Sequence, residues 1–109
     1  MTFLQDAGNA MVEESKIVGY LLNAGHPKNG GKSVFFAAFG FAIDQWDLLR
    51  DALRRHPVAN RVADTQQSPH GVKYAVRCFI VTPDGRDPCI TSIWITDGVR
   101  PPRLVTAYP

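Results

Sequence analysis

The segment VKYAVRCFIV, residues 72–81, is the clearest indication of the fold class of this chain. Its side chains alternate, so that one face carries Val72, Tyr74, Val76, Cys78 and Ile80, and the other face carries the residues between them. A period of two residues is typical of a β-strand that has one face against a core. Residues 72–81 therefore predict a half-buried strand.

Three more strands are predicted around this one. Cys89–Thr96 and Arg103–Tyr108 follow it, and turn residues in Thr82–Arg86 and Asp97–Pro102 separate them. Arg61–Gln67 precedes it as a polar strand that suits the edge of a sheet. The short connections favour an antiparallel arrangement.

The first half of the chain changes to a helical period. Glu13–Asn23 predicts a short amphipathic helix. Lys32–Phe39 predicts a second one, whose apolar residues we expect at the heart of the core: Val34, Phe35, Phe36 and Phe39. A third helix is expected to begin at Ile43, with Asp44 as its N-cap, and to end at Pro57.

These patterns predict an α+β fold, in which two to three short N-terminal helices pack on one face of a four-stranded antiparallel sheet. At 109 residues the chain is expected to be a single domain over residues 1–109. Its expected parts are an N-terminal extension over residues 1–12, a helical part over residues 13–56 and the sheet over residues 60–109.

Composition and charge narrow the function classes. A hydrophobic fraction of 45% is too high for a disordered chain, and the longest apolar run, Val34–Ile43, is too short for a membrane helix. The first residues lack the features of a secretory signal, so we expect a soluble cytoplasmic protein without a membrane partner. The net charge is +2, but residues 16–109 carry +5, which suits contacts with a few phosphates.

The two cysteines, Cys78 and Cys89, are predicted to be small buried residues of neighbouring strands. Their spacing does not fit a zinc site, and a disulfide is geometrically open but lacks a secretory context. His56 and His70 precede Pro57 and Gly71 and are interpreted as turn residues. A single histidine, His26, makes a poor metal site, so no metal and no cofactor are expected.

Polar residues gather in the segment HPKNGGK, residues 26–32. His26 follows the first predicted helix, whose dipole favours the protonated ring. Lys32 opens the next helix after two glycines, which let backbone amides approach a ligand closely. With Lys28, the segment is a candidate phosphate site. The alternative interpretation is a capped helix–helix turn with a solvated lysine.

The last predicted strand offers a second candidate. Thr106 and Tyr108 lie two residues apart on one face with Leu104, and both hydroxyl groups can donate to the same anion. Threonine and tyrosine are also good strand formers, which is a purely structural explanation.

Cations on the predicted sheet form a third group. Lys73, Arg77 and Arg103 can bind phosphate, and Trp94 nearby can stack on a base. The alternative is that these cations form the solvent side of a half-buried sheet.

Two motifs of this chain resemble those of one small bacterial domain family. The first runs from GYLLN (residues 19–23) through HPKNGGK (26–32) to FFAAFGF (35–41), and the second is PRLVTAYP (102–109). The resemblance covers residues 11–109, and the family is a domain of unknown function that occurs alone and at the ends of polymorphic-toxin and phage-related proteins. Its layout is similar to that of the barnase, EndoU, colicin and RelE-like ribonucleases.

This resemblance implies a metal-independent endoribonuclease toxin domain, which cleaves RNA by attack of a 2′-hydroxyl on its own phosphate. His26 is then expected to be a general base or acid, and Lys32 to stabilise the phosphorane. Thr106 and Tyr108 are expected to position the phosphate. A cognate antitoxin or immunity protein is an expected partner, beside the RNA substrate.

A second interpretation stays open. The chain is then a non-catalytic protein- or nucleic-acid-binding module of a toxin–antitoxin or phage-related system, with the edge strand Arg61–Gln67 available for pairing. The two interpretations differ in geometry. The nuclease requires the segment of His26 and Lys32 to lie beside Thr106 and Tyr108.

Overall fold

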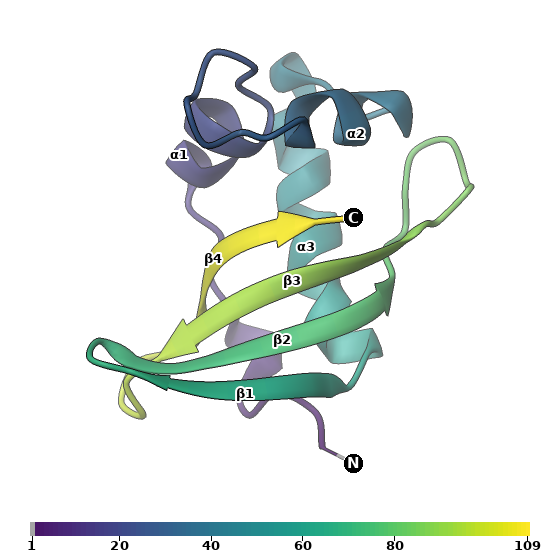
Figure 1. The fold of residues 1–109 in the computed structure, drawn as a ribbon. Helices are drawn as coiled ribbons and strands as arrows, with labels where there is room; N and C mark the ends of the chain where they lie inside the picture. Colours follow the sequence, from purple (N-terminus) through teal and green to yellow (C-terminus); the bar gives the residue numbers. More distant parts are fainter. Residues whose placement is uncertain (1) are drawn as a thin grey trace.

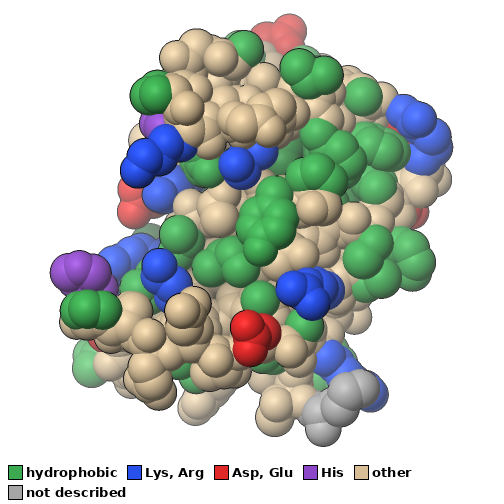
Figure 2. All heavy atoms as spheres, in the orientation of Figure 1, with side chains coloured by type: hydrophobic (Ala, Val, Ile, Leu, Met, Phe, Trp, Pro, Cys, Tyr) green, Lys and Arg blue, Asp and Glu red, His purple; other side chains and the backbone are tan. Residues whose placement is uncertain are grey.

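In the computed structural model, which describes residues 2–109, four strands form one antiparallel sheet in the order β1-β2-β3-β4. The strands are β1 (Val62–Ser68), β2 (Gly71–Phe79), β3 (Cys89–Thr96) and β4 (Arg103–Tyr108). Figure 1 shows helix α3 (Trp46–Ala59) behind the sheet, and helices α1 (Glu14–Lys16) and α2 (Lys32–Ala38) beyond its β4 edge. The predicted α+β fold is confirmed. We call the sheet face turned away from α3 the outer face; Figure 2 shows it from the same side.

The first predicted helix, Glu13–Asn23, is wrong in length and kind. The chain forms one turn of α-helix, α1, and continues as the π-helical turn η2 (Ile17–Leu21). Ile17 and Leu21 are fully buried, and this packing outweighs the poorer hydrogen bonding of a π turn. A further 3₁₀ turn, η1 (Ala7–Asn9), precedes α1. Every helix within residues 2–109 is too short or too polar to cross a bilayer.

The third helix differs from the prediction at both ends. Asp44 lies inside a 3₁₀ turn, η3 (Ile43–Gln45), rather than at an N-cap. At the other end, α3 continues through Pro57 to Ala59. Proline removes only one backbone hydrogen bond here, in the last turn, and the contacts of the neighbouring His56 hold that turn on the sheet.

His56 is a buried residue of a hydrogen-bond network, so its interpretation as a turn residue is wrong. Its Nε2 lies 2.8 Å from the carbonyl oxygen of Cys78 and donates to it, so Nδ1 accepts from Ser92 Oγ at 2.7 Å. The same Ser92 oxygen accepts the indole N–H of Trp94 at 2.7 Å. This arrangement selects the neutral imidazole, and burial lowers the pKa of His56.

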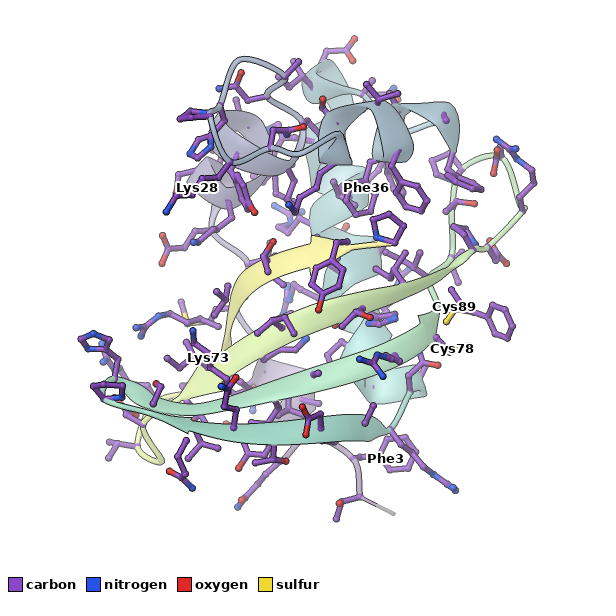
Figure 3. All side chains as sticks on the ribbon, in the orientation of Figure 1. Phe3, Lys28, Phe36, Lys73, Cys78 and Cys89 are labelled. Carbon is purple, nitrogen blue, oxygen red and sulfur yellow. The ribbon has the colours of Figure 1, made fainter. Side chains whose placement is uncertain are left out.

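The prediction that both cysteines are buried is also wrong. Cys78, near the end of β2, is half-buried, and Cys89, at the start of β3, is exposed (Figure 3). Cys78 has a φ of 135°, which is rare for an L residue and interrupts the alternation of β2 at this point. The Cys78 thiol beside it raises the pKa of the Cys89 thiol.

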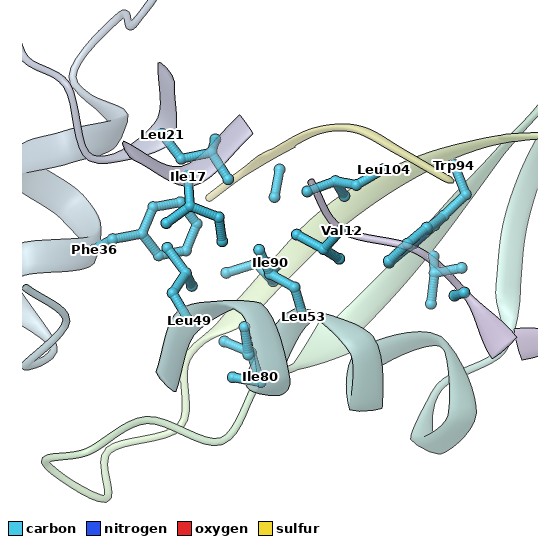
Figure 4. Close-up of a cluster of buried hydrophobic side chains, with 14 of the residues drawn as sticks. Val12, Ile17, Leu21, Phe36, Leu49, Leu53, Ile80, Ile90, Trp94 and Leu104 are labelled. Carbon is cyan, nitrogen blue, oxygen red and sulfur yellow. The ribbon is translucent and has the colours of Figure 1, made fainter. Parts of the chain in front are cut away.

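The core lies between the inner face of the sheet, α3 and the N-terminal segments (Figure 4). Its larger members include Val12, Ile17, Leu21, Phe36, Leu49, Leu53, Ile80, Ile90, Trp94 and Leu104. Helix α2 contributes less than predicted: Phe36 is buried, Phe35 and Phe39 are half-buried, and Val34 is 71% exposed. A seven-residue helix turns one face to the core, so the neighbouring apolar residue points to solvent.

Residues 4–12, which precede α1, pack against the rest of the fold. Leu4 and Ala10 are buried in the core. Met11 donates its amide to the carbonyl of Pro102 at 2.8 Å and accepts the amide of Leu104 at 2.9 Å. This N-terminal segment therefore runs beside β4.

A bulge in β4 decides which side chains reach the outer face. Ile93 pairs with Thr106 and Trp94 pairs with Leu104, so Val105 is an extra residue in β4. Leu104 points into the core, whereas Thr106 points to the outer face. The prediction that Leu104 shares the face of Thr106 is wrong, because one inserted residue reverses the alternation.

Candidate functional site

The side chain of Asn29 holds the glycine-rich loop between η2 and α2. Its Nδ2 donates to the carbonyl oxygens of Tyr20 at 2.7 Å and Leu21 at 3.3 Å, and its Oδ1 accepts the amide of Ser33 at 3.0 Å. Asn29 is 3% exposed, so these bonds are shielded from water. Asn29 was not predicted as a site residue from the sequence. Its signal was an asparagine just ahead of two glycines and a helix start.

Two glycines turn the loop into α2. Gly30 and Gly31 have φ of 61° and 85°, consecutive left-handed conformations that glycine adopts without steric cost. The turn places Lys32 at the first position of α2.

A cavity of about 490 Å³ opens between η2, this loop and β4. We call it the loop cavity; its lining is Ser15, Lys16, Gly19, Tyr20, His26, Lys28, Val105 and Thr106. Both sequence motifs contribute to it. Of the residues that the sequence singled out, it brings together His26, Lys28 and Thr106.

Tyr20 connects the two motifs. Its Oη lies 2.9 Å from Thr106 Oγ1, and its ring meets the His26 ring edge-on with 4.9 Å between centroids. Each hydroxyl has one hydrogen, so while the two are bonded to each other, one of them is free to donate to an anion at this cationic rim. Tyr20 falls within the first predicted helix, Glu13–Asn23, and was not predicted as a site residue. Helical spacing does not distinguish a core aromatic from one whose polar tip reaches a site.

His26 is half-buried, and one of its ring nitrogens is occupied. Nδ1 accepts the amide of Lys28 at 3.0 Å, so the neutral ring carries its proton on Nε2. To act as a base at Nε2, the ring must give up this bond, at a cost of about 0.5–1.5 kcal/mol. General acid–base catalysis raises the rate by about 10²- to 10⁴-fold. The corresponding decrease in the activation free energy, about 1.4 kcal/mol for each factor of ten, exceeds the cost of breaking this hydrogen bond.

Lys32 braces the loop rather than lining the cavity. Its Nζ donates to the carbonyl oxygens of Asn29 at 3.2 Å and Lys28 at 3.4 Å, and lies 5.6 Å from the centroid of the Tyr20 ring. The cations that line the cavity are Lys16 and Lys28.

The other expected site residues lie elsewhere. Tyr108 and Arg77 line a second cavity, of about 150 Å³, on the outer face. Arg103 is exposed at the start of β4. Trp94 is fully buried, so the expectation that it stacks on a base is wrong; its indole belongs to the core.

Lysine or arginine side chains line both cavities, and the second cavity also contains the Asp64 carboxylate. Figure 2 shows Lys and Arg side chains around a hydrophobic area on the outer face. Within residues 2–109, no three His, Cys, Asp or Glu side chains are grouped so that they could hold a metal ion. The polar side chains that line the loop cavity are two lysines, three hydroxyl groups and an imidazole.

Comparison with known proteins gives a family and a fold likeness. No curated protein matches the chain significantly. A similar solved structure is a chain of a contact-dependent growth inhibition toxin–immunity protein complex from Klebsiella pneumoniae 342, with 16% identity, a TM-score of 0.73 and 97% of each chain covered. At that identity the likeness concerns the fold. Residues 3–109 match the domain of unknown function DUF6883, so the family resemblance begins earlier than residue 11. Because this match spans nearly the whole sequence, the chain belongs to the DUF6883 family.

Proposed function

We propose that this chain is a toxin domain that cleaves RNA without a metal ion, by attack of a 2′-hydroxyl on the adjoining phosphate. The loop cavity carries the proposal, because a histidine, two lysines and a hydroxyl pair converge there from two distant segments of the chain. The fold likeness to a chain of a toxin–immunity complex supports the toxin role.

The residues divide the chemistry among them. Lys28 and Lys16 attract the phosphate, and the Thr106 hydroxyl donates to its oxygen as negative charge develops. His26 takes the proton of the 2′-hydroxyl at Nε2. The bond between phosphorus and the 5′-oxygen then breaks, and this oxygen leaves with a proton, for which the Tyr20 hydroxyl is the candidate donor once its hydrogen bond with Thr106 is released. The products are a 2′,3′-cyclic phosphate and a free 5′-hydroxyl.

The test is growth arrest on induced expression, together with cleavage of RNA by the purified protein in EDTA. We expect His26→Ala to lower the cleavage rate by about 100-fold or more, since it removes the acid–base group. Lys28→Ala should weaken substrate binding, and Lys32→Ala should lower activity by loosening the loop. The matched control is His70→Ala, in the exposed turn between β1 and β2, which should retain full activity.

Three results would contradict the proposal: no cleavage by the folded protein, cleavage that EDTA abolishes, or full activity of His26→Ala. The RNA ends supply a further check. A 3′-phosphate product without any cyclic intermediate excludes attack by the 2′-hydroxyl.

A second candidate is a non-catalytic binding module, which the edge strand β1 favours. β1 stands at one end of the strand order, and its residues 63–67 are all exposed. Such an edge can pair with a strand of an antitoxin or immunity protein. The similar solved complex holds both a toxin and its immunity protein. A chain that binds a partner but neither arrests growth nor cuts RNA would have this second role.

A further inference from the structure

The second cavity lies on the outer face of the sheet, and the strand register explains its shape. On β2, Ala75 stands between Lys73 and Arg77, and all three point to the outer face. Ala75 pairs with Ile93 on one side and with Asp64 on the other. The short alanine side chain between two long cations leaves the hollow of about 150 Å³. We call it the sheet cavity.

Its walls carry complementary chemistry. On the β1 side are the Asp64 carboxylate and the amide of Gln66, which pairs with Lys73. On the β4 side is the Tyr108 ring, 37% exposed. A carboxylate accepts hydrogen bonds and cannot donate, an aromatic ring offers a stacking surface, and cations attract phosphate.

Arg77, the cation on the Tyr108 side of the sheet cavity, is held in orientation by its neighbours on the sheet. Arg77 pairs with Thr91, which pairs with Tyr108 on the next strand, so these three side chains form one row across the outer face. Arg77 Nε donates to Thr91 Oγ1 at 3.3 Å. This bond leaves the two terminal nitrogens of the guanidinium to face a phosphate.

The sheet cavity adjoins the loop cavity across β4. Thr106 lines the loop cavity and Tyr108 lines the sheet cavity, and both side chains point to the outer face. Residues two apart on a strand are separated by about 7 Å. A nucleotide attached to a phosphate at Thr106 is therefore long enough to reach the Tyr108 ring and the sheet cavity beside it.

We propose that the sheet cavity binds the base of the nucleotide next to the scissile phosphate, and that Asp64 selects a base with an exocyclic amine over uracil. The inference rests on the proposed RNA substrate. The amine of cytosine, adenine or guanine donates to the Asp64 carboxylate. Uracil has a carbonyl oxygen where cytosine has its amine, and its one edge donor, N3–H, lies between two carbonyl oxygens that the carboxylate repels. Tyr108 stacks on the base, and Lys73 and Arg77 bind the phosphate on the other side of this nucleotide, away from the scissile one.

The test measures binding without cleavage. Fluorescein-labelled 2′-O-methyl oligomers of cytidine and of uridine lack the attacking hydroxyl and differ at the base edge, where cytosine has an amine. At fixed salt, fluorescence anisotropy should show that the wild type binds the cytidine oligomer about fivefold or more tightly than the uridine oligomer, as a charge-assisted hydrogen bond to a base edge allows.

The variants separate base selection from charge and from stacking. Asp64→Asn should abolish the preference, because an amide both donates and accepts. Asp44→Asn removes the same charge from an exposed site on η3 and should keep the preference. Tyr108→Ala should weaken both oligomers about tenfold through lost stacking.

Equal binding of the two oligomers by the wild type, binding of neither, or a preference that survives Asp64→Asn would overturn the inference. Failure of the proposed function looks different. The protein would then leave natural RNA uncut in EDTA, while the oligomer measurement, which involves no cleavage, still reports on the sheet cavity.

Discussion

Replacing Asn29 with alanine tests how the loop cavity is built. The substitution removes three shielded hydrogen bonds, two to the carbonyl oxygens of Tyr20 and Leu21 and one from the Ser33 amide. Each contributes about 0.5–1.5 kcal/mol, and buried groups left without partners add to the cost. We therefore expect the free energy of unfolding to fall by about 2–4 kcal/mol. That is a large part of the stability of a small domain.

The assay is equilibrium unfolding in urea, followed by the fluorescence of Trp46 and the fully buried Trp94. The matched control is Asn23→Ala in the same loop region. Asn23 makes two bonds to the backbone, to the Gly19 carbonyl at 3.2 Å and from the Gly25 amide at 2.9 Å, but both are exposed to solvent. Its loss should stay below about 1 kcal/mol, since water replaces exposed bonds.

Two results would refute this role of Asn29: a free energy of unfolding for Asn29→Ala within about 0.5 kcal/mol of the wild-type value, or an equally large loss in Asn23→Ala. Either result would mean that packing of η2 and α2, rather than the buried amide, sets the loop. Activity measured on the same variants adds a second comparison. A loop that loosens should lower RNA cleavage by Asn29→Ala more than by Asn23→Ala.

Two further predictions concern stability. Burial lowers the pKa of His56 below its ordinary value of about 6.5, so the unfolded chain takes up the proton first as the pH falls. The free energy of unfolding should thus be highest above pH ~6.5 and decrease below it, which urea titrations at several pH values check. A pKa of His56 above about 6.5, measured by NMR in the folded protein, would contradict this prediction. The second prediction compares two glycines that have positive φ. A Cβ added at Gly71, where φ is 131°, would lie 2.5 Å from the Thr96 carbonyl oxygen. A Cβ added at Gly85, where φ is 78°, would meet open space among the described residues. Gly71→Ala should therefore cost at least about 2 kcal/mol more than Gly85→Ala, and equal losses in urea unfolding would rule out the clash as the cause.

The sheet was predictable from local patterns. Alternation over residues 72–81 and turn residues on either side follow from the geometry of one strand and its neighbours, so a single sequence was sufficient to place Cys89–Thr96 and Arg103–Tyr108. The helical part was less predictable. The π turn at Ile17–Leu21 and the passage of α3 through Pro57 depend on burial against other elements, which local propensity does not contain.

The same division applies to individual side chains. The histidine at position 56 has no periodic signal; it is buried because Ser92 and the Cys78 carbonyl, far along the chain, satisfy both of its ring nitrogens. The reversal at Leu104 comes from one extra residue opposite β3, which is a property of a pair of strands.

The chemical groups of the candidate site can be read from the residues alone: an imidazole, lysines and glycines in one segment, and a threonine and a tyrosine in another. Their division between two cavities depends on how the chain packs. Tyr20 and Thr106 meet across 86 positions of sequence, which joins His26 and Lys28 to β4, while Tyr108 faces a separate hollow. The physical reason is that side-chain chemistry is local, whereas cavities form where distant elements pack around a common core.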